Sequence, residues 1–288
     1  MISVSSIQEV REYVSNTKAK GKLVGFVPTM GYLHDGHLSL VKECRKYCDI
    51  VVMSIFVNPI QFDNKDDLAA YPVDIENDKQ LAESAGVDLL FIPDVQTMYD
   101  NSKTSVVMKD LTNCLCGATR PGHFNGVLTV VAKLFNIVLP NVTVFGKKDI
   151  QQAIIITQMI EDLNFPVKII IAPTAREESG LAMSSRNKHL SVDERKRAVC
   201  LYNSMKKAVL LIEQGERKWS VVEAVMRNLI EEGLPQKIDY ISAVDFYTLE
   251  PIDVLKERFL IAVAVYFGTT RLIDNVIIDL NGEVICEF

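Results

Sequence analysis

Residues 26–41 read FVPTMGYLHDGHLSLV, an apolar run that passes through a loop containing glycine and histidine into a segment with helical spacing. Lys22–Val27 has the composition of a short buried strand. Leu38 and Val41 lie three residues apart, which places them on one face of a helix that follows Gly36. In a doubly wound α/β sheet, loops of this kind at the carboxyl ends of the strands hold the ligand.

The same alternation of strand and helix continues through the first two thirds of the chain. Four more runs rich in Val, Ile and Phe are predicted strands: Ile50–Val57, Val87–Ile92, Val142–Phe145 and Val167–Ala172. Helical patterns lie between or beside them, at Asp74–Ala85, Asn125–Val138 and Asp149–Leu163. This order predicts a parallel sheet with crossover helices, the doubly wound, Rossmann-like α/β class. We place this domain at residues 1–176.

The last third has a different pattern. Two capping boxes, Ser191-x-x-Glu194 and Ser220-x-x-Glu223, predict helix starts. The two helical runs are predicted to end at Gly215 and Gly233. Three apolar runs then follow without a helix between them: Ile238–Phe246, Phe259–Phe267 and Leu272–Leu280. Consecutive strands joined by short loops favour an antiparallel sheet. We place a smaller α+β domain at residues 177–288 and expect it to act as a lid.

Composition excludes several classes of protein. The 288 residues are 48% hydrophobic and 24% charged, typical of a globular protein, and the net charge is −6. An acidic balance argues against nucleic-acid binding as the main function. The longest apolar stretches, such as Phe259–Phe267, are too short to span a membrane, and MISVSSIQEVREYV lacks the unbroken apolar core of a signal peptide. We expect a cytoplasmic protein with reduced cysteines.

The loop after the first predicted strand carries two imidazoles, His34 and His37, and two glycines, Gly31 and Gly36. It matches neither the dinucleotide fingerprint nor the Walker P-loop. Two neutral imidazoles at a helix start can both point at an anion, which suits stabilisation of charge in a transition state. Capping or surface histidines are the alternative interpretation.

The loop is one of several motifs that occur in a fixed order. It contains the H-x-G-H motif of the nucleotidyltransferase superfamily. It is followed by SIFVNPIQF at 54–62, RPGHFNGV at 120–127, FGKKDIQQ at 145–152 and MSSRN at 183–187. Together, from about residue 22 to 190, these motifs resemble the pantoate–β-alanine ligase family.

The resemblance implies a two-step ligase. The carboxylate of (R)-pantoate attacks the α-phosphorus of ATP and releases pyrophosphate, and the amine of β-alanine then attacks the pantoyl adenylate to give pantothenate and AMP. Magnesium accompanies the ATP, and a homodimer is implied. One alternative is a nucleotidylyltransferase that transfers AMP to a phosphorylated acceptor, and another is a non-catalytic nucleotide-binding module. Two glutamines, Gln61 and Gln152, and the C-terminal domain of about a hundred residues argue against the transferase.

The resemblance also implies site residues. Those expected to bind ATP are Met30, Gly31, Tyr32, Leu33, His34, Asp35, Gly36, His37, Gly146, Lys147, Lys148, Asp149, Ala175, Met183, Ser184, Ser185 and Arg186. Among these, His37 has the place of a general acid. We interpret His34 and His37 mainly as stabilisers of charge on the α-phosphate, with Lys148 as the third catalytic residue. Lys147 stands where the family usually has Glu, and we expect it to face solvent.

Other polar residues are assigned to the second and third substrates. Those expected to bind pantoate are Gln61, Gln152, Met30 and Asn58, with Gln61 also bordering the β-alanine site. Neutral amides can both donate to and accept from the two hydroxyls of pantoate. Asp78 occupies a stretch where relatives place an acidic residue near magnesium. Arg120 and His123 are either anion contacts or structural partners.

Overall fold

The structure, a computed structural model, describes residues 1–63, 65–281 and 285–288. It divides into two compact units. Unit 1 comprises Met1–Thr112, Arg120–Gly146 and Gln151–Ala172, and unit 2 comprises Asn113–Thr119, Lys147–Ile150 and Pro173–Phe288. The chain thus leaves unit 1 briefly after Gly146, at the end of a predicted strand.

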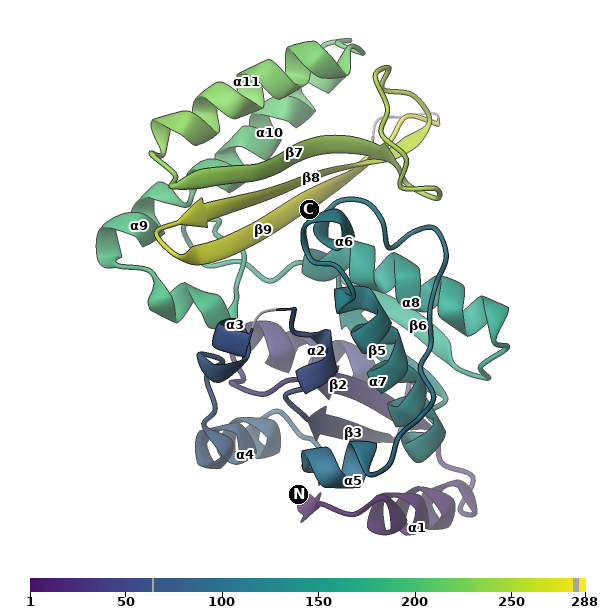
Figure 1. The fold of residues 1–288 in the computed structure, drawn as a ribbon. Helices are drawn as coiled ribbons and strands as arrows, with labels where there is room; N and C mark the ends of the chain where they lie inside the picture. The colour runs from purple at the N-terminus through teal and green to yellow at the C-terminus, as the bar shows by residue number, and fades with distance from the viewer. Residues whose placement is uncertain (64, 282–284) are drawn as a thin grey trace. The chain divides into compact units, whose positions relative to one another are not determined.

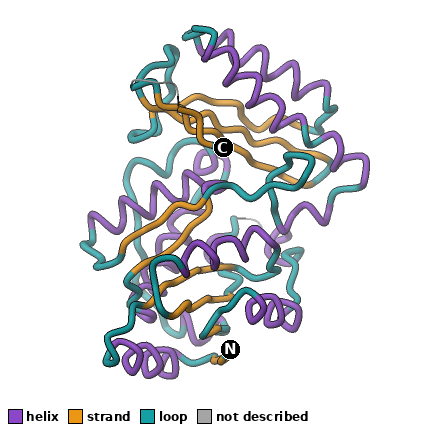
Figure 2. Tube along the Cα trace, turned by 180° about the vertical axis from the view of Figure 1, so that it is seen from behind, coloured by secondary structure: helices purple, strands orange, loops and turns teal. Residues whose placement is uncertain are grey.

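Unit 1 is built on a six-stranded parallel sheet, as the alternation of elements predicts (Figure 1). Its strands are β1 (Ile2–Val4), β2 (Val24–Thr29), β3 (Ile50–Ile55), β4 (Leu89–Phe91), β5 (Val142–Gly146) and β6 (Lys168–Ala172). Its helices are α1 (Ile7–Lys18), α2 (Asp35–Arg45), α3 (Lys65–Ala69), α4 (Ile75–Ser84), α5 (Val95–Tyr99), α7 (His123–Val138) and α8 (Ile150–Asp162), with the 3-10 turn η1 (Pro59–Gln61). The doubly wound α/β prediction is confirmed, and Figure 2 traces the alternation along the chain.

The strand order is β1-β4-β3-β2-β5-β6. From β2 the chain therefore winds through β3 and β4 toward one edge, and then returns to lay β5 and β6 on the other side of β2. Val27, Met53 and Val144 on the three central strands are completely buried. Strands covered on both faces form near-continuous apolar runs, which is why the sequence shows them clearly.

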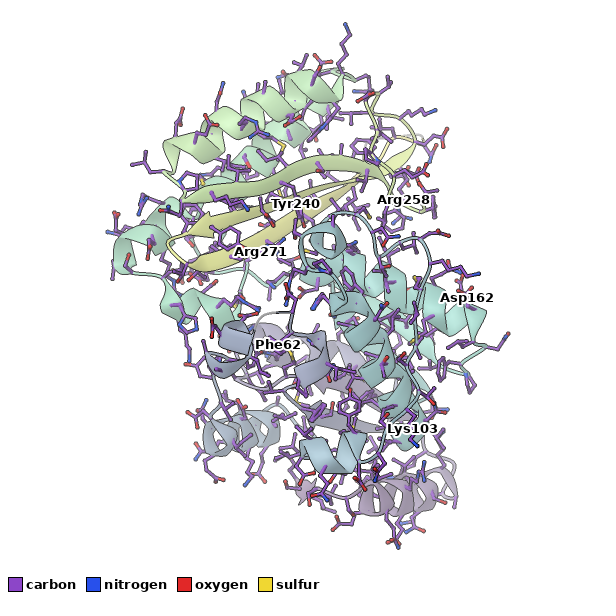
Figure 3. All side chains as sticks on the ribbon, viewed as in Figure 1. Phe62, Lys103, Asp162, Tyr240, Arg258 and Arg271 are labelled. Atoms are coloured by element: carbon purple, nitrogen blue, oxygen red, sulfur yellow. The ribbon has the colours of Figure 1, made fainter. Side chains whose placement is uncertain are left out.

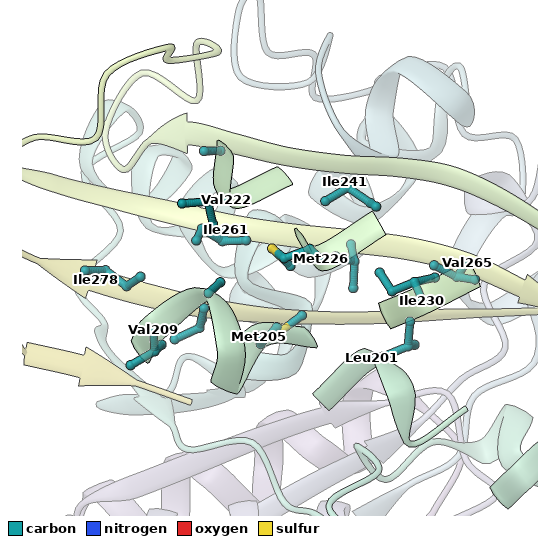
Figure 4. Close-up of a cluster of buried hydrophobic side chains, with 14 of the residues drawn as sticks. Leu201, Met205, Val209, Val222, Met226, Ile230, Ile241, Ile261, Val265 and Ile278 are labelled. Carbon is teal, nitrogen blue, oxygen red and sulfur yellow. The ribbon is translucent and has the colours of Figure 1, made fainter. Parts of the chain in front are cut away.

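Unit 2 carries a four-stranded antiparallel sheet in the order β10-β9-β8-β7. Its strands are β7 (Lys237–Asp245), β8 (Arg258–Phe267), β9 (Thr270–Asp279) and β10 (Ile285–Glu287). Its helices are α6 (Cys116–Thr119), α9 (Val192–Arg197), α10 (Cys200–Glu213) and α11 (Trp219–Glu232), with the 3-10 turns η2 (Lys147–Asp149) and η3 (Ser185–His189). Helices α10 and α11 cover one face of this sheet, where Met205, Met226 and Ile261 pack together (Figure 4).

One predicted helix start is right and the other is wrong. Ser191 and Glu194 form the predicted capping box at the start of α9. Ser220 caps nothing, because α11 already begins at Trp219, with Lys218 as the N-cap. The Trp219 N–H donates to the Asp253 carbonyl, so pairing with a distant segment, and not the local motif, sets this helix start.

The sheet face away from α10 and α11 is polar at one end, where Tyr240 and Arg271 lie (Figure 3). Arg271 donates to Asp239 Oδ2 from Nε at 3.0 Å and from Nη2 at 2.9 Å. It also contacts Cys116 Sγ, which lies 3.2 Å from the Tyr240 hydroxyl, and burial raises the pKa of that tyrosine. This cluster attaches the short helix α6 to the sheet. Among the described residues, no helix is both long and apolar enough to cross a membrane.

Candidate active site

The sheet of unit 1 brings the first residues of two expected ATP-binding segments, Met30 and Gly146, to its switch point. Strands β2 and β5 are parallel neighbours, with Gly25 opposite Val142 and Phe26 opposite Thr143. The loop that starts at Met30 leaves the carboxyl end of β2, and Gly146 ends β5. Ligands of open α/β sheets bind where the strand order reverses, between two such carboxyl ends. A Cβ built on Gly146 would have Leu40 Cδ2, at 3.9 Å, as its nearest neighbour, so this residue leaves space beside the loop.

The loop Met30–His37 is held in shape by a buried carboxylate. Asp78 of α4 is fully buried and accepts hydrogen bonds from the backbone N–H groups of Tyr32 at 2.8 Å and Leu33 at 2.6 Å. Gly31 has φ +83°, and a Cβ there would come within 2.9 Å of Asp78 Oδ2, so only glycine fits. Burial raises the pKa of Asp78, against the opposing effect of its two backbone donors.

His34 and His37 face each other at the start of α2. His34 is the N-cap, and its Nδ1 accepts from the Gly36 N–H at 3.1 Å. His37 Nδ1 accepts from the His34 N–H at 3.3 Å, and the two ring centroids are 4.1 Å apart. A neutral imidazole has one acceptor and one donor nitrogen, so each ring must carry its proton on Nε2. The helix start therefore combines two capping Nδ1 acceptors with two Nε2–H groups, which are the kind of donor that an anionic ligand takes.

The residues around Asp78 are compatible with a magnesium ion that is carried by the ATP phosphates. Both Asp78 oxygens already accept backbone hydrogen bonds. Across residues 1–63, 65–281 and 285–288, no three His, Cys, Asp or Glu side chains are grouped so as to hold a metal. Magnesium is commonly bound by substrate phosphates with few protein ligands, which agrees with this arrangement. Direct contact between Asp78 and magnesium stays a prediction, whereas its role as a clamp for the loop is visible.

Gln61, in η1, is the centre of a buried amide network. Its Nε2 donates to Met30 Sδ at 3.0 Å, and its Oε1 accepts from Asn58 Nδ2 at 3.0 Å. The Asn58 amide also donates to the Gly126 carbonyl at 3.1 Å, and its Oδ1 accepts from the Tyr99 hydroxyl at 2.8 Å. Asn58, almost completely buried, thus lies behind Gln61 and fixes the orientation of its amide.

Helix α7 packs directly on η1. A Cβ on Gly126 would lie 2.4 Å from the Ile60 carbonyl oxygen and 2.6 Å from Gln61 Cα, so glycine permits this close approach. His123 Nδ1 lies 2.7 Å from the Gln61 carbonyl, which can only accept, so Nδ1 is the donor. Arg120 reaches the other ring nitrogen at 3.4 Å and forms an ion pair with Asp63. His123 thus holds η1 and Arg120 has structural partners in His123 and Asp63, while anion contact by either residue stays a prediction.

The two neighbouring glutamines of α8 have different environments. Gln151 is buried and donates to the Leu111 carbonyl at 3.2 Å, whereas Gln152 is half-buried. Gln151 therefore has a packing role. Gln152 is the more exposed of the two residues.

The turn η2 in unit 2 corrects one prediction. Lys147 does not face solvent, because only 7% of its side chain is exposed. The Asn275 amide of β9 donates to the carbonyls of Lys147 and Lys148, and this draws the turn against the sheet. Lys148 is more accessible, and its Nζ lies 3.3 Å from Asp149 Oδ2.

The last expected ATP segment is a short hairpin followed by the turn η3. The Met183 N–H donates to the Ala175 carbonyl at 2.9 Å, and Arg176 pairs with Ala182. Ser184 caps η3, since its Oγ accepts from the Arg186 N–H at 3.2 Å. Ser185 and Arg186 are both partly exposed. Unit 2 thus holds Lys147–Asp149, Ala175 and Met183–Arg186, and unit 1 holds the other expected site residues.

Comparison with known proteins identifies the family. A family model described as pantoate-beta-alanine ligase matches residues 2–277. The chain belongs to this family. A pantothenate synthetase from Caldicellulosiruptor saccharolyticus is 53% identical over 97% of this chain and all of its own length, and one from Moorella thermoacetica is 49% identical over 96% and 99%.

Solved structures of the family match over nearly the whole length as well. A pantothenate synthetase from Thermus thermophilus superposes with a TM-score of 0.90 at 42% identity, covering 96% of this chain and 98% of its own. A pantoate–β-alanine ligase from Francisella tularensis, complexed with β,γ ATP and β-alanine, gives 0.80 at 37% identity, covering 96% and 97%. The resemblance read from the motifs is confirmed, and this chain is a ligase of pantothenate biosynthesis.

Sequence reasoning missed the residues that hold the site in place. Asn275 and Tyr99 had no motif signal, because each acts through one hydrogen bond network formed by segments far apart in sequence. Gly126 had a signal, since it is the last glycine of the RPGHFNGV motif. An isolated glycine near a helix start is a sign of close packing.

Proposed function

We propose that this chain joins (R)-pantoate to β-alanine in two steps, with ATP as the activating substrate. The pantoate carboxylate attacks the α-phosphorus, the bond to pyrophosphate breaks, and pantoyl adenylate forms. The β-alanine amine then attacks the acyl carbon and displaces AMP. A carboxylate becomes a good electrophile only when its oxygen belongs to a good leaving group, and AMP is one.

The observation that carries the proposal is the pair of Nε2–H donors on His34 and His37. They lie at the N-terminus of α2, where backbone N–H groups and the helix dipole favour negative charge. Their Nδ1 atoms are held by backbone N–H groups, so the donors are preorganised and need no rearrangement as charge develops on the α-phosphate. Displaced pyrophosphate, complexed with magnesium, hardly needs a proton, so charge stabilisation is the main role.

The amides of Gln61, which is buried, and Gln152, which is half-buried, support the choice of pantoate. Both can donate to and accept from hydroxyl groups, and a cationic clamp would instead bind the carboxylate tightly in the ground state and slow its attack. Gln61 also borders the proposed β-alanine position. Magnesium would enter with the triphosphate, where it neutralises phosphate charge. The lid role of residues 177–288, a homodimer and a cytoplasmic location stay predictions.

Isotope exchange between pyrophosphate and ATP tests the proposal. We expect exchange with pantoate present and β-alanine absent, and none without pantoate, because the adenylate forms before the amine arrives. Product formation without such exchange would contradict the two-step reaction. AMP transfer to a phosphorylated acceptor would favour the nucleotidylyltransferase alternative, which has the same H-x-G-H loop.

A further inference from the structure

Strand β9 of unit 2 contacts two segments that are distant in sequence and are both expected to bind ATP. One is η2, Lys147–Asp149, and the other is the hairpin and turn from Ala175 to Arg186. The contacts come from adjacent residues, Asp274 and Asn275, whose side chains are only 3% and 2% exposed. Buried polar side chains in the middle of a strand require partners, and here the partners are these two segments.

Asn275 donates both of its amide hydrogens to the turn η2. Its Nδ2 donates to the Lys147 carbonyl at 3.0 Å and to the Lys148 carbonyl at 2.9 Å. Two successive carbonyls held by one amide fix the backbone on both sides of the Lys148 Cα. The direction in which the Lys148 side chain leaves the turn is therefore set by Asn275.

Asp274 holds the second segment through Arg176. The Arg176 guanidinium donates to both carboxylate oxygens, at 2.6 and 2.9 Å, and to the Gly180 carbonyl at 3.0 Å. It also lies 4.5 Å from the ring centroid of Tyr202. Arg176 directly follows Ala175, and its strand partner Ala182 directly precedes Met183, so this ion pair fixes the base from which Met183–Arg186 extends.

The two contacts share one support, strand β9. Successive side chains of a strand point to opposite faces, so Asn275 reaches η2 from one face and Asp274 reaches Arg176 from the other. Strand β9 is paired with β8 along its whole length, from Thr270 to Asp279, which keeps its register fixed. Asp274 Oδ1 also accepts from the Asn275 N–H at 2.9 Å.

We propose that Asp274 and Asn275 are positioning residues for catalysis, which act through Arg176 and the η2 backbone to hold Lys148 and Arg186 in the geometry that binds the ATP phosphates. Neither residue contacts substrate in this proposal. It rests on the proposed assignment of Lys148 and Arg186 to ATP. Small misplacements of groups that orient a reacting phosphate are expensive, and a shift of about 1 Å can cost about a hundredfold in rate.

A double-mutant cycle with Asn275→Ala and Lys148→Ala tests the first contact. The readout is kcat/KM for ATP in pantoate-dependent pyrophosphate exchange. We expect Asn275→Ala to lower it at least about tenfold. When Lys148 is already replaced by Ala, Asn275→Ala should lower kcat/KM for ATP by less than about a further twofold, because the side chain that Asn275 positions is absent. KM for β-alanine should not change.

Ile278→Val is the matched control. It lies on β9, is fully buried and faces the helices, so it weakens packing without touching η2. Its effect should be the same with and without Lys148. If Asn275→Ala does not fold, Asn275→Ser, which keeps one donor, replaces it. Additive effects of Asn275 and Lys148, or no effect of either change alone, would overturn the proposal.

The second contact is tested with Arg176→Lys and Arg186→Ala. Lysine keeps the charge beside Asp274 but lacks the planar pair of nitrogens with which Arg176 reaches both Asp274 oxygens and the Gly180 carbonyl. We expect Arg176→Lys to raise KM for ATP several-fold alone and hardly at all in the Arg186→Ala background. If the effects of Arg176→Lys and Arg186→Ala on KM for ATP were additive, the proposed role of Asp274 would be overturned. If the wild-type enzyme showed no pantoate-dependent exchange, the proposed function itself would fail, and this outcome differs from all of those above.

Discussion

The loop Met30–His37 and the turn Ser184–Asn187 are both capped turns expected to bind phosphate, but they are built differently. In the loop, the capping side chains His34 and His37 are themselves the catalytic candidates. In the turn, Ser184 caps the backbone while Asn187 ties it to Glu177 and Ala182, and Arg186 carries the charge. A motif is easiest to recognise where structure and chemistry need the same residues, as they do in the loop.

The largest effect that tests this comparison comes from His34→Asn. The asparagine Oδ1 can replace Nδ1 as the cap acceptor, but nothing replaces the Nε2 donor. We expect kcat to fall on the order of a hundredfold or more while the melting temperature changes little. Steady-state kinetics and thermal unfolding measure the two quantities.

The control is His34→Ala, which removes the cap as well as the donor. It should lose similar activity and also about 1 kcal/mol of stability. If His34→Asn kept near-normal turnover, His34 would be a capping residue only, and the two turns would not differ as described.

Asp78→Asn tests whether the loop depends on its buried clamp. An asparagine offers one oxygen to two backbone donors, and its amide hydrogens would face one of them. We expect a loss of roughly 1–3 kcal/mol in the free energy of unfolding, measured with denaturant, and a lower kcat because His34 and His37 follow the clamped residues.

This substitution should also change the pH dependence of stability. Burial raises the native pKa of Asp78 above its ordinary value of 3.8, so between these two values the folded chain binds more protons than the unfolded chain. The free energy of unfolding of the wild type, relative to Asp78→Asn, should therefore decrease as the pH rises through this range and be constant above it. An increase with pH would show that the native pKa is lowered.

Gln152→Ala separates pantoate binding from phosphate binding. The variant leaves the pantoate hydroxyls without a partner, which should weaken the free energy of pantoate binding by roughly 1–3 kcal/mol, or about tenfold to a hundredfold in affinity. ATP affinity should hardly change. Calorimetry with each substrate gives both values. Gln151→Ala, on the neighbouring packing residue, is the control, and it should lower stability more than pantoate affinity. Impaired ATP binding with normal pantoate binding in Gln152→Ala would contradict the assignment.

The smallest effect is expected from Ser184→Ala. The capping hydrogen bond to the Arg186 N–H is lost, which costs about 1 kcal/mol, or about fivefold in an equilibrium constant. We expect KM for ATP to rise a few-fold and the melting temperature to stay within a few degrees. An effect as large as that of His34→Asn would show that this turn, too, combines cap and catalytic group.

The sequence predicted most of the fold because the central strands are continuous apolar runs and Ser191 has its capping partner at the right spacing. It did not predict the strand order, since parallel pairing of β2 with β5 leaves no local pattern. The helix start predicted at Ser220 was wrong because the hydrogen bond from the Trp219 N–H to the Asp253 carbonyl overrides the motif. Neither α1 nor its capping box, Ser6 with Glu9, was identified.

For the site, motifs predicted residues but not their environments. Lys147, where the family usually has Glu, was expected to face solvent, but it is buried in the turn that Asn275 draws against β9. The clamp of Asp78 on Tyr32 and Leu33 joins residues more than forty positions apart. Hydrogen bonds between residues so far apart in the sequence depend on how α4 packs against the loop. A single sequence contains no local pattern that predicts them.

The pairing of β2 with β5 also has a consequence for how the protein is made. Strand β2 ends at Thr29, and its neighbour begins roughly 110 residues later, at Val142. Ribosomes add about 5–20 residues per second, so β2 waits on the order of 5–20 s for that neighbour. During this time its edge and the loop with both histidines belong to an incomplete sheet. In a nascent chain, the paired carboxyl ends of β2 and β5, where we propose that ATP binds, therefore form only after β5 has emerged.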